Sequence, residues 1–297
     1  MTQPVTEGHA DFRGWKTWYR VTGNLRGKMP PLLALHGGPG VPHNYLLRYA
    51  ELASSDRAVI HYDQLGCGNS THLPDRDKGF WQVPLFVEEL SNLLSHLGIA
   101  DRYHMLGQSW GGMLAAEHAV TKPSGLRALV ISNSPASMTL LLQEANKLRA
   151  LLPPEVQATL LRHEAEGTTD SEAYNTAVRV FYDRHVCRIP WPAELEASFA
   201  ALGTDPTVYH TMNGPSEFHC IGTIRDWSII DRLKLIAAPT LLISGRHDEA
   251  TEAVVQPFAD NIPDVRWNIF EASSHLPHIE EPEACLAVVA DFIAAYD

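Results

Sequence analysis

This sequence of 297 residues has few of the features that mark membrane or secreted proteins. No stretch approaches the roughly 18 consecutive apolar residues of a membrane span. Residues 1–9 contain neither a basic start nor an apolar run, so they do not resemble a secretion signal. We therefore expect a cytoplasmic protein with no membrane partner.

Positive charge is also scarce, because 23 Lys and Arg residues face 35 Asp and Glu residues and the formal net charge is −12. Nucleic acids and anionic membranes bind clustered Lys and Arg side chains. We therefore expect no nucleic acid as the main partner. The acidic balance is common in enzymes and does not identify a substrate.

The sequence lacks the spacings of disulfide and metal frameworks. Its four cysteines are scattered without a CxxC pair, which favours free thiols. Its fifteen histidines include no HExxH pattern or other metal-ligand spacing. We expect neither a metal nor a cofactor.

What is present is the composition of an ordinary globular protein, with 45% hydrophobic and 20% charged residues. Short apolar runs alternate with helical patterns, which predicts a mostly parallel sheet covered by helices on both faces. The predicted strands are 15–21, 32–35, 58–62, 102–106, 126–131, 240–244 and 265–270. The predicted core helices are 83–97, one after the strand at 102–106, and 282–296.

The middle of the chain interrupts this alternation. Residues 135–227 show helical patterns at 140–152, 154–166 and 171–185 and no clear strand. We expect a core domain of residues 1–134 and 228–297 with a helical cap domain of residues 135–227. Active sites of open α/β sheets lie at the carboxyl ends of strands, so a cap inserted there would cover the site.

The most informative motif is Gly107–Gly111, which has the form Gly-x-Ser-x-Gly. A strand precedes it and a helix follows it, which predicts a sharp turn that exposes the Ser109 hydroxyl at a helix N-terminus. The motif alone also occurs around structural serines. Its flanking elements favour Ser109 as a nucleophile.

A serine nucleophile needs a base and a group that orients the base. Asp248 follows the strand 240–244 and His275 follows the strand 265–270, in the chain order Ser, acid, His of α/β-hydrolases. Asp248 could instead be an ordinary turn residue. His278 shares the loop of His275 and is the rival base.

Acyl transfer also requires N–H donors for the developing oxyanion. The backbone N–H of Trp110 begins the helix after the nucleophile, and the loop His36–Gly40 follows an early strand. We expect Trp110 and Gly38 to supply the two donors. A simple tight turn would explain the loop. It would not explain why the loop, the Ser109 motif, Asp248 and His275 occur in this chain order.

Three segments together resemble the proline iminopeptidase family of α/β-hydrolases: His36–Gly40, Asp63–Ser70 and Gly107–Gly112. Two cap segments, Met212–Phe218 and Gly222–Trp227, are similar to the branch that contains the tricorn-interacting aminopeptidase. The resemblance covers nearly the whole chain. It implies the α/β-hydrolase fold and the release of N-terminal residues from short peptides or aminoacyl amides.

The resemblance further implies that acidic residues hold the free α-ammonium of the substrate. Glu217 in the cap and Glu249 beside Asp248 match such positions. An α-amine is largely protonated near neutrality. A carboxylate facing it would form a charge-assisted hydrogen bond that contributes about 1.5–3 kcal/mol to binding. Without the resemblance, each glutamate could be a surface residue.

Three other functions remain open at this stage. The same family branch includes amino-acid amidases and enzymes that remove an aminoacyl group from a biosynthetic intermediate. A general carboxylesterase or thioesterase would have the same triad without an amine requirement. A receptor on this fold would be non-catalytic. The cap aromatics could line a pocket for a ring such as proline, or form the core of the cap.

Overall fold

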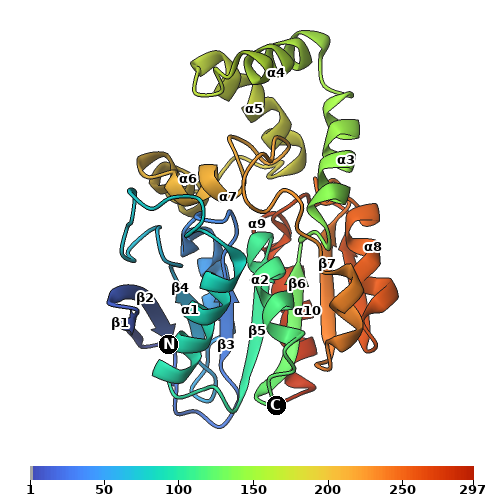
Figure 1. The fold of residues 1–297 in the computed structure, drawn as a ribbon. Coiled ribbons are helices and arrows are strands. Elements are labelled where there is room, and N and C mark those ends of the chain that lie inside the picture. The colour runs from blue at the N-terminus through green and yellow to red at the C-terminus, as the bar shows by residue number, and fades with distance from the viewer. Residues whose placement is uncertain (1–2) are drawn as a thin grey trace.

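A computed structural model describes residues 3–297 and contains one eight-stranded sheet in the order β1-β2-β4-β3-β5-β6-β7-β8 (Figure 1). The first two strands pair antiparallel at one edge, and the strands from β4 to β8 pair in parallel. The strands are β1 Val5–Phe12, β2 Trp15–Thr22, β3 Leu32–Leu35, β4 Val59–Tyr62, β5 Tyr103–Gln108, β6 Leu126–Ser132, β7 Thr240–Gly245 and β8 Val265–Phe270. The predicted α/β-hydrolase fold is confirmed.

Helices cover both faces of the sheet because its central strands are apolar on both faces. In β3, Leu33 and Leu35 pack in one core with α1, α2 and α8, and Leu32 and Ala34 pack in a second core with η1 and α10. This is the pattern of a parallel sheet buried on both sides. The helices of these two layers are η1 His43–Leu52, α1 Val83–His96, α2 Trp110–Ala119, η2 Ile230–Leu235, α8 Glu252–Asn261, α9 Pro277–Glu280 and α10 Pro282–Ala294.

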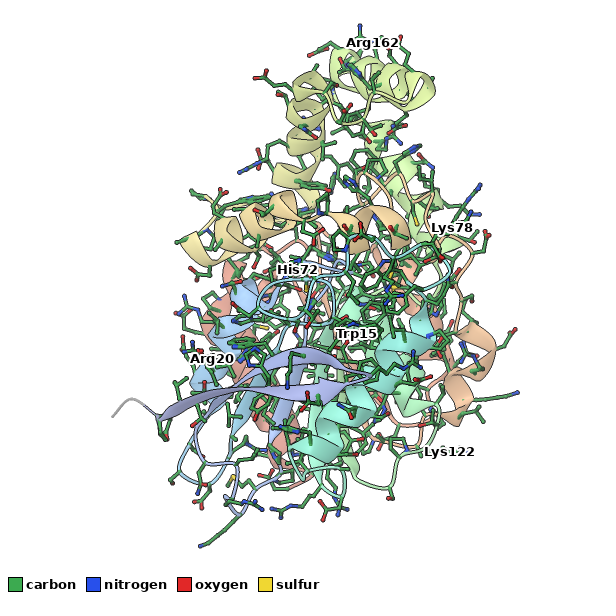
Figure 2. The ribbon with its side chains drawn as sticks, turned by 60° about the vertical axis from the view of Figure 1, so that its left-hand side comes forward. Trp15, Arg20, His72, Lys78, Lys122 and Arg162 are labelled. Carbon is green, nitrogen blue, oxygen red and sulfur yellow. The ribbon has the colours of Figure 1, made fainter. Side chains whose placement is uncertain are left out.

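A helical insert lies between β6 and β7, over the carboxyl ends of the strands (Figure 1). Its helices are α3 Met138–Arg149, α4 Pro154–Glu166, α5 Glu172–His185, α6 Ala193–Thr204 and α7 Thr207–Met212. An antiparallel bridge joins Ser137 to Ser228, so the insert begins and ends at neighbouring points. Arg162 in α4 marks its far tip, well away from the sheet (Figure 2). In the described part of the chain, no helix combines the length and the apolar character that crossing a membrane requires.

The structure differs from the predicted elements mainly at the edges of the sheet and in the insert. The strand β1 was not predicted, and it pairs with β2 over eight residues to form the long hairpin that carries Trp15 and Arg20 (Figure 2). Its first residues, Val5 to Glu7, are exposed, so hydrophobic alternation does not mark it. The helices α6, α7, α8 and α9 and the 3-10 helices η1 and η2 were also not predicted.

Candidate active site

Ser109 lies at the turn between β5 and α2 with a strained backbone, φ 55° and ψ −124°. A non-glycine residue at positive φ is uncommon, and the surrounding packing must hold it there. Neighbouring glycines make this packing possible. A Cβ on Gly107 would lie 2.1 Å from the carbonyl oxygen of Gly111, and one on Gly111 would lie 2.1 Å from that of Leu35. The turn at Ser109 is therefore so tight that it requires glycine at positions 107 and 111.

His275 and Asp248 lie side by side on the loops after β8 and β7. The distance between His275 Nδ1 and Asp248 Oδ1 is 2.7 Å, and both side chains are buried. The backbone N–H of Ala250 donates to the same Asp248 oxygen at 2.9 Å. With Nδ1 engaged in this way, the Nε2 atom of His275 is the one that remains for a substrate or nucleophile. Ser109 and His275 line the same pocket.

Asn133 is a site residue that the sequence interpretation missed. Its Nδ2 donates to Asp248 Oδ2 at 2.6 Å and to the carbonyl of Ser274 at 3.2 Å. It follows β6, is fully buried and has a left-handed backbone with φ 51°. Asparagine is one of the few residues that adopt this conformation readily. The only sequence signal was a polar residue directly after a buried strand.

His278, the rival base, lies elsewhere. Its ring stacks on Tyr49 with centroids 5.0 Å apart, and its Nε2 is 3.1 Å from the carbonyl oxygen of Tyr45. Burial lowers its pKa to about 3, which keeps the imidazole neutral. These contacts bind His278 into the core, while His275 is the histidine beside Asp248.

The two expected oxyanion donors border the space in front of Ser109. Gly38 and Trp110 line the same pocket as Ser109, and Gly38 has a φ of 108° that favours glycine. Neither backbone N–H donates a hydrogen bond to another residue among those described. Two free N–H groups beside a serine hydroxyl can stabilise a negative oxygen bound there.

Gln108 ties the nucleophile strand to two other loops. Its Nε2 donates to the carbonyl of His275 at 3.2 Å, and its Oε1 accepts from the Tyr45 hydroxyl at 2.6 Å. Tyr45 in turn accepts from the N–H of Gly37 at 2.7 Å. One buried amide thus aligns the loop of the base with the glycine-rich loop.

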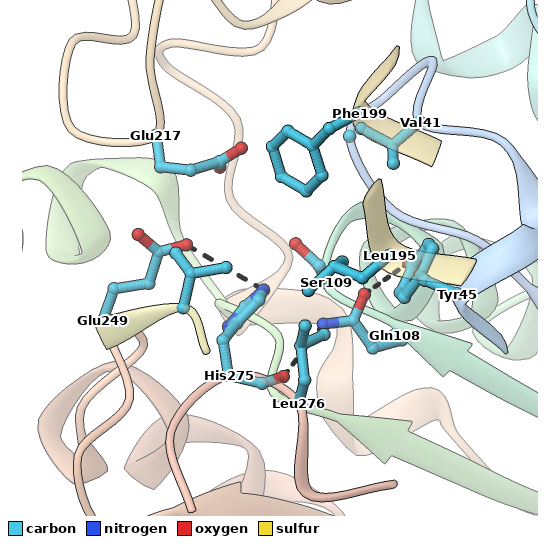
Figure 3. Close-up of a pocket in the computed structure, with 12 residues that line it drawn as sticks. Val41, Tyr45, Gln108, Ser109, Leu195, Phe199, Glu217, Glu249, His275 and Leu276 are labelled. Carbon is cyan, nitrogen blue, oxygen red and sulfur yellow. Dashed lines mark hydrogen bonds and ion pairs between the residues drawn. The ribbon is translucent and has the colours of Figure 1, made fainter. Parts of the chain in front are cut away.

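The pocket around Ser109 has two lobes that share Gly38, Ser109, Glu217, Glu249 and His275. The first has apolar walls that include Val41, Leu195 and Phe199, and Figure 3 places Ser109 between this wall and the two glutamates. The second is lined by Trp110, Met113, Pro135, Met138, Leu141, Asn213, Ile224 and Ala250. The insert covers both lobes, contributing Val186, Leu195 and Phe199 to the first and Met138, Leu141 and Asn213 to the second.

Glu217 and Glu249 are brought together in this pocket from distant parts of the chain. Glu217 lies after α7 and accepts a hydrogen bond from the Tyr209 hydroxyl at 2.6 Å. Glu249 is only 2% exposed, its Oε1 is 3.9 Å from His275 Nε2, and its Oε2 has no hydrogen-bond partner. A buried carboxylate oxygen without a donor is costly unless a ligand supplies one.

The carboxylates and His275 alter one another's protonation. Burial raises the pKa of Glu217, and burial together with the charge of Glu217 raises the pKa of Glu249 well above its usual value. Burial disfavours the His275 imidazolium, but the carboxylate of Asp248 and then the two glutamates outweigh it and raise the pKa of His275 to about 9. The ionised forms of the two glutamates are thus disfavoured in the free enzyme, and a cation bound beside them would stabilise those forms.

Elsewhere in the described residues, a single group of potential metal ligands lies close together: His36, Asp63 and Cys67. The His36 Nε2 already accepts from the N–H of Gln64 at 2.9 Å. Asp63 accepts from the N–H of His43 at 3.0 Å and lies 2.7 Å from its Nδ1. The potential ligand atoms of His36 and Asp63 are thus already engaged in hydrogen bonds that hold the loop after β4, so the cluster is structural.

Comparison with known proteins places this chain in a family. The sequence profile of the alpha/beta hydrolase fold family matches residues 30–282. A proline iminopeptidase of Heyndrickxia coagulans is 38% identical over 97% of this chain and 98% of its own length. One from Lactobacillus delbrueckii subsp. bulgaricus is 36% identical, over 99% of each chain.

Solved structures agree with these relatives. The crystal structure of VinJ superposes with a TM-score of 0.97 at 56% identity, covering 98% of this chain and 99% of that one. A proline iminopeptidase of Mycobacterium smegmatis superposes with a TM-score of 0.90 at 52% identity, covering 98% of both chains.

Proposed function

This chain belongs to the proline iminopeptidase family of α/β-hydrolases, and on that premise we propose that it releases an N-terminal amino acid through an acyl-enzyme on Ser109. The substrate is a peptide or aminoacyl amide whose first residue is proline or another small apolar residue. The apolar wall of Val41, Leu195 and Phe199 supports this preference.

Each step of the reaction has a residue suited to it. His275 accepts the Ser109 proton, oriented by Asp248 at 2.7 Å, and the hydroxyl oxygen attacks the scissile carbonyl. The N–H groups of Gly38 and Trp110 stabilise the tetrahedral oxyanion. His275 then protonates the departing amine, and water hydrolyses the acyl-enzyme by the same path.

The observation that carries the proposal is the pair of carboxylates at the reacting centre. Glu217 and Glu249 line both lobes beside Ser109, and Glu249 Oε2 is buried without a donor. An α-ammonium supplies three N–H donors and a positive charge. A neutral N-terminus would leave the glutamates unpaired, so the enzyme would be an exopeptidase.

The test compares aminoacyl arylamides of Pro, Ala, Leu, Phe and Gly with their N-acetylated forms. We expect kcat/KM to favour the free amines. In Glu217→Gln this preference should fall by about 10–150-fold, the loss of a charge-assisted hydrogen bond of about 1.5–3 kcal/mol. The exposed Glu155 of the insert provides the control Glu155→Gln, which should leave the preference unchanged. Equal rates on free and blocked amines in the wild-type enzyme would contradict amine recognition and favour a general esterase.

A second candidate, an amino-acid amidase or deaminoacylase, is favoured by the lining of the second lobe. Met113, Met138 and Leu141 line it, and no Lys or Arg occurs among the described residues around it. The carboxylate of a dipeptide would meet no cation there, whereas an uncharged leaving group needs none. A prolyl amide with an apolar amine should therefore be cleaved faster than the matching dipeptide. The reverse order would favour the peptidase.

A further inference from the structure

We propose that Glu249 also restrains the general base: in the free enzyme Glu249 stabilises a proton on His275 through an ion pair, and the substrate ammonium displaces that proton to water. The inference rests on the proposed amine recognition and extends it. Glu249 would then make the chemical step itself, and not only binding, depend on a free amine.

The geometry leaves His275 Nε2 between two partners. Its Nδ1 is engaged by Asp248, so any proton that Glu249 attracts must sit on Nε2 or on the glutamate. Glu249 Oε1 is 3.9 Å from Nε2, as the dashed line in Figure 3 shows. Ser109 and His275 are both among the described residues, and no hydrogen bond joins the Ser109 hydroxyl to His275. A protonated Nε2 held toward Glu249 cannot accept the serine proton.

Charges around the pair favour retention of the proton. The titratable groups that face it are Asp248 on the same loop, Glu217 after α7, Tyr209 in α7, Tyr182 and His185 in α5, and His278 in α9. Among the described residues, neither Lys nor Arg lines the pocket around the pair, and burial lowers the pKa values of His185 and His278. His275 is therefore the group in this pocket that can bring positive charge to the carboxylates, which agrees with its raised pKa of about 9.

An arriving ammonium replaces the proton on His275 as the positive partner of Glu249. It brings one positive charge and N–H donors to Glu249, including to the Oε2 atom that has no partner. Glu249 is then a paired carboxylate, and the Nε2 of His275 is neutral and free to face Ser109. The proton leaves to bulk water, so charge is conserved. A blocked N-terminus cannot make this exchange.

The kinetic test uses nitrophenyl esters of proline and N-acetylproline with Glu249→Gln. The pH dependence of kcat/KM reports groups of the free enzyme. For the N-acetylated ester, we expect kcat/KM to rise with pH along a limb centred near pH 9 in the wild-type enzyme and at least one pH unit lower in Glu249→Gln. The rate at pH 7 should rise about tenfold for each unit of the shift. Glu252→Gln, an exposed carboxylate three residues away, should leave the limb in place.

An unchanged limb in Glu249→Gln would overturn the inference and leave Glu249 as an amine ligand only. A second measurement needs no variant: calorimetric titration with prolinol at pH 7, in two buffers of different ionisation enthalpy. We expect about one proton released for each prolinol bound, and a release of none would also overturn the proposal. If instead the wild-type enzyme fails to distinguish free from blocked esters, the proposed amine recognition is wrong. The shift of the limb with the N-acetylated ester would still test whether Glu249 raises the pKa of His275.

Discussion

Removing the Asn133 side chain is the most direct test of how the site holds its acid. In Asn133→Gly, Asp248 loses the donor at 2.6 Å, and a hydrogen bond to a charged group contributes about 1.5–3 kcal/mol. Glycine adopts the φ of 51° without strain, but its greater freedom in the unfolded chain costs a further 0.5–1 kcal/mol, roughly. We therefore expect the free energy of unfolding to fall by about 2–4 kcal/mol.

The same change should lower activity without abolishing it. Loss of a properly oriented triad acid costs about 10⁴ in kcat. Asp248 keeps the donor from Ala250 at 2.9 Å, so only part of that loss applies, and we expect kcat to fall about 10–100-fold. Urea unfolding and arylamide hydrolysis at pH 8 measure the two effects.

The neighbouring Ser132 provides the control. Its hydroxyl donates to the opposite end of the same amide, Asn133 Oδ1, at 2.7 Å. Ser132→Ala should cost about 0.5–1.5 kcal/mol of stability, as for a neutral hydrogen bond, and change kcat little. If Asn133→Gly stays within about twofold of wild-type kcat and loses less than about 1 kcal/mol, Asn133 does not support Asp248 as argued here.

Three further outcomes are expected. Ser109→Ala should lower kcat by about 10⁴–10⁶-fold and abolish labelling by a serine-directed phosphonate, and retained labelling would point to another nucleophile. Tyr209→Phe removes the donor at 2.6 Å from Glu217 and should weaken the preference for free amines about threefold to tenfold in kcat/KM, with blocked esters unaffected. The free energy of unfolding should decrease as the pH is lowered from 6.5 to about 4. Buried histidines whose folded pKa lies near 3 to 4 take up protons only on unfolding, and each lowers the stability by up to about 1.4 kcal/mol per pH unit. Urea midpoints that do not change across this range would contradict this expectation. These histidines are His36, His61, His104, His118 and His278.

The sequence was sufficient to predict the parts of the fold and site that depend on local patterns. Buried parallel strands are short apolar runs, and Ser109, Asp248 and His275 lie in the turn or loop after one of them, so the sequence alone could propose them as the catalytic residues. The edge strand β1 was missed because its exposed half carries no hydrophobic alternation. The amphipathic pattern of α8 was present, but Pro257 inside the helix obscured it.

Contacts between distant segments could not be predicted from patterns. Asn133 and Asp248 are 115 residues apart, and nothing near Asn133 in the sequence indicates a carboxylate partner. The aromatic residues of the insert divide in a way that periodicity does not show. Phe199 lines the pocket, whereas Tyr174 and Phe181 are buried in the core of the insert.

The neighbouring ends of the insert have a consequence for how such enzymes diversify. Besides the bridge between Ser137 and Ser228, the N–H of Met138 donates to Trp227 at 3.0 Å and that of Ile229 to Ala136 at 3.1 Å. A segment whose two ends are hydrogen-bonded to each other in this way can be exchanged as a cassette, because it joins the sheet at two closely spaced points. Apart from Glu217, the proposed catalytic, oxyanion and amine-binding residues lie outside that cassette. A chimera carrying the insert of a relative would therefore keep Ser109, Asp248 and His275 and acquire different walls in both lobes of the pocket.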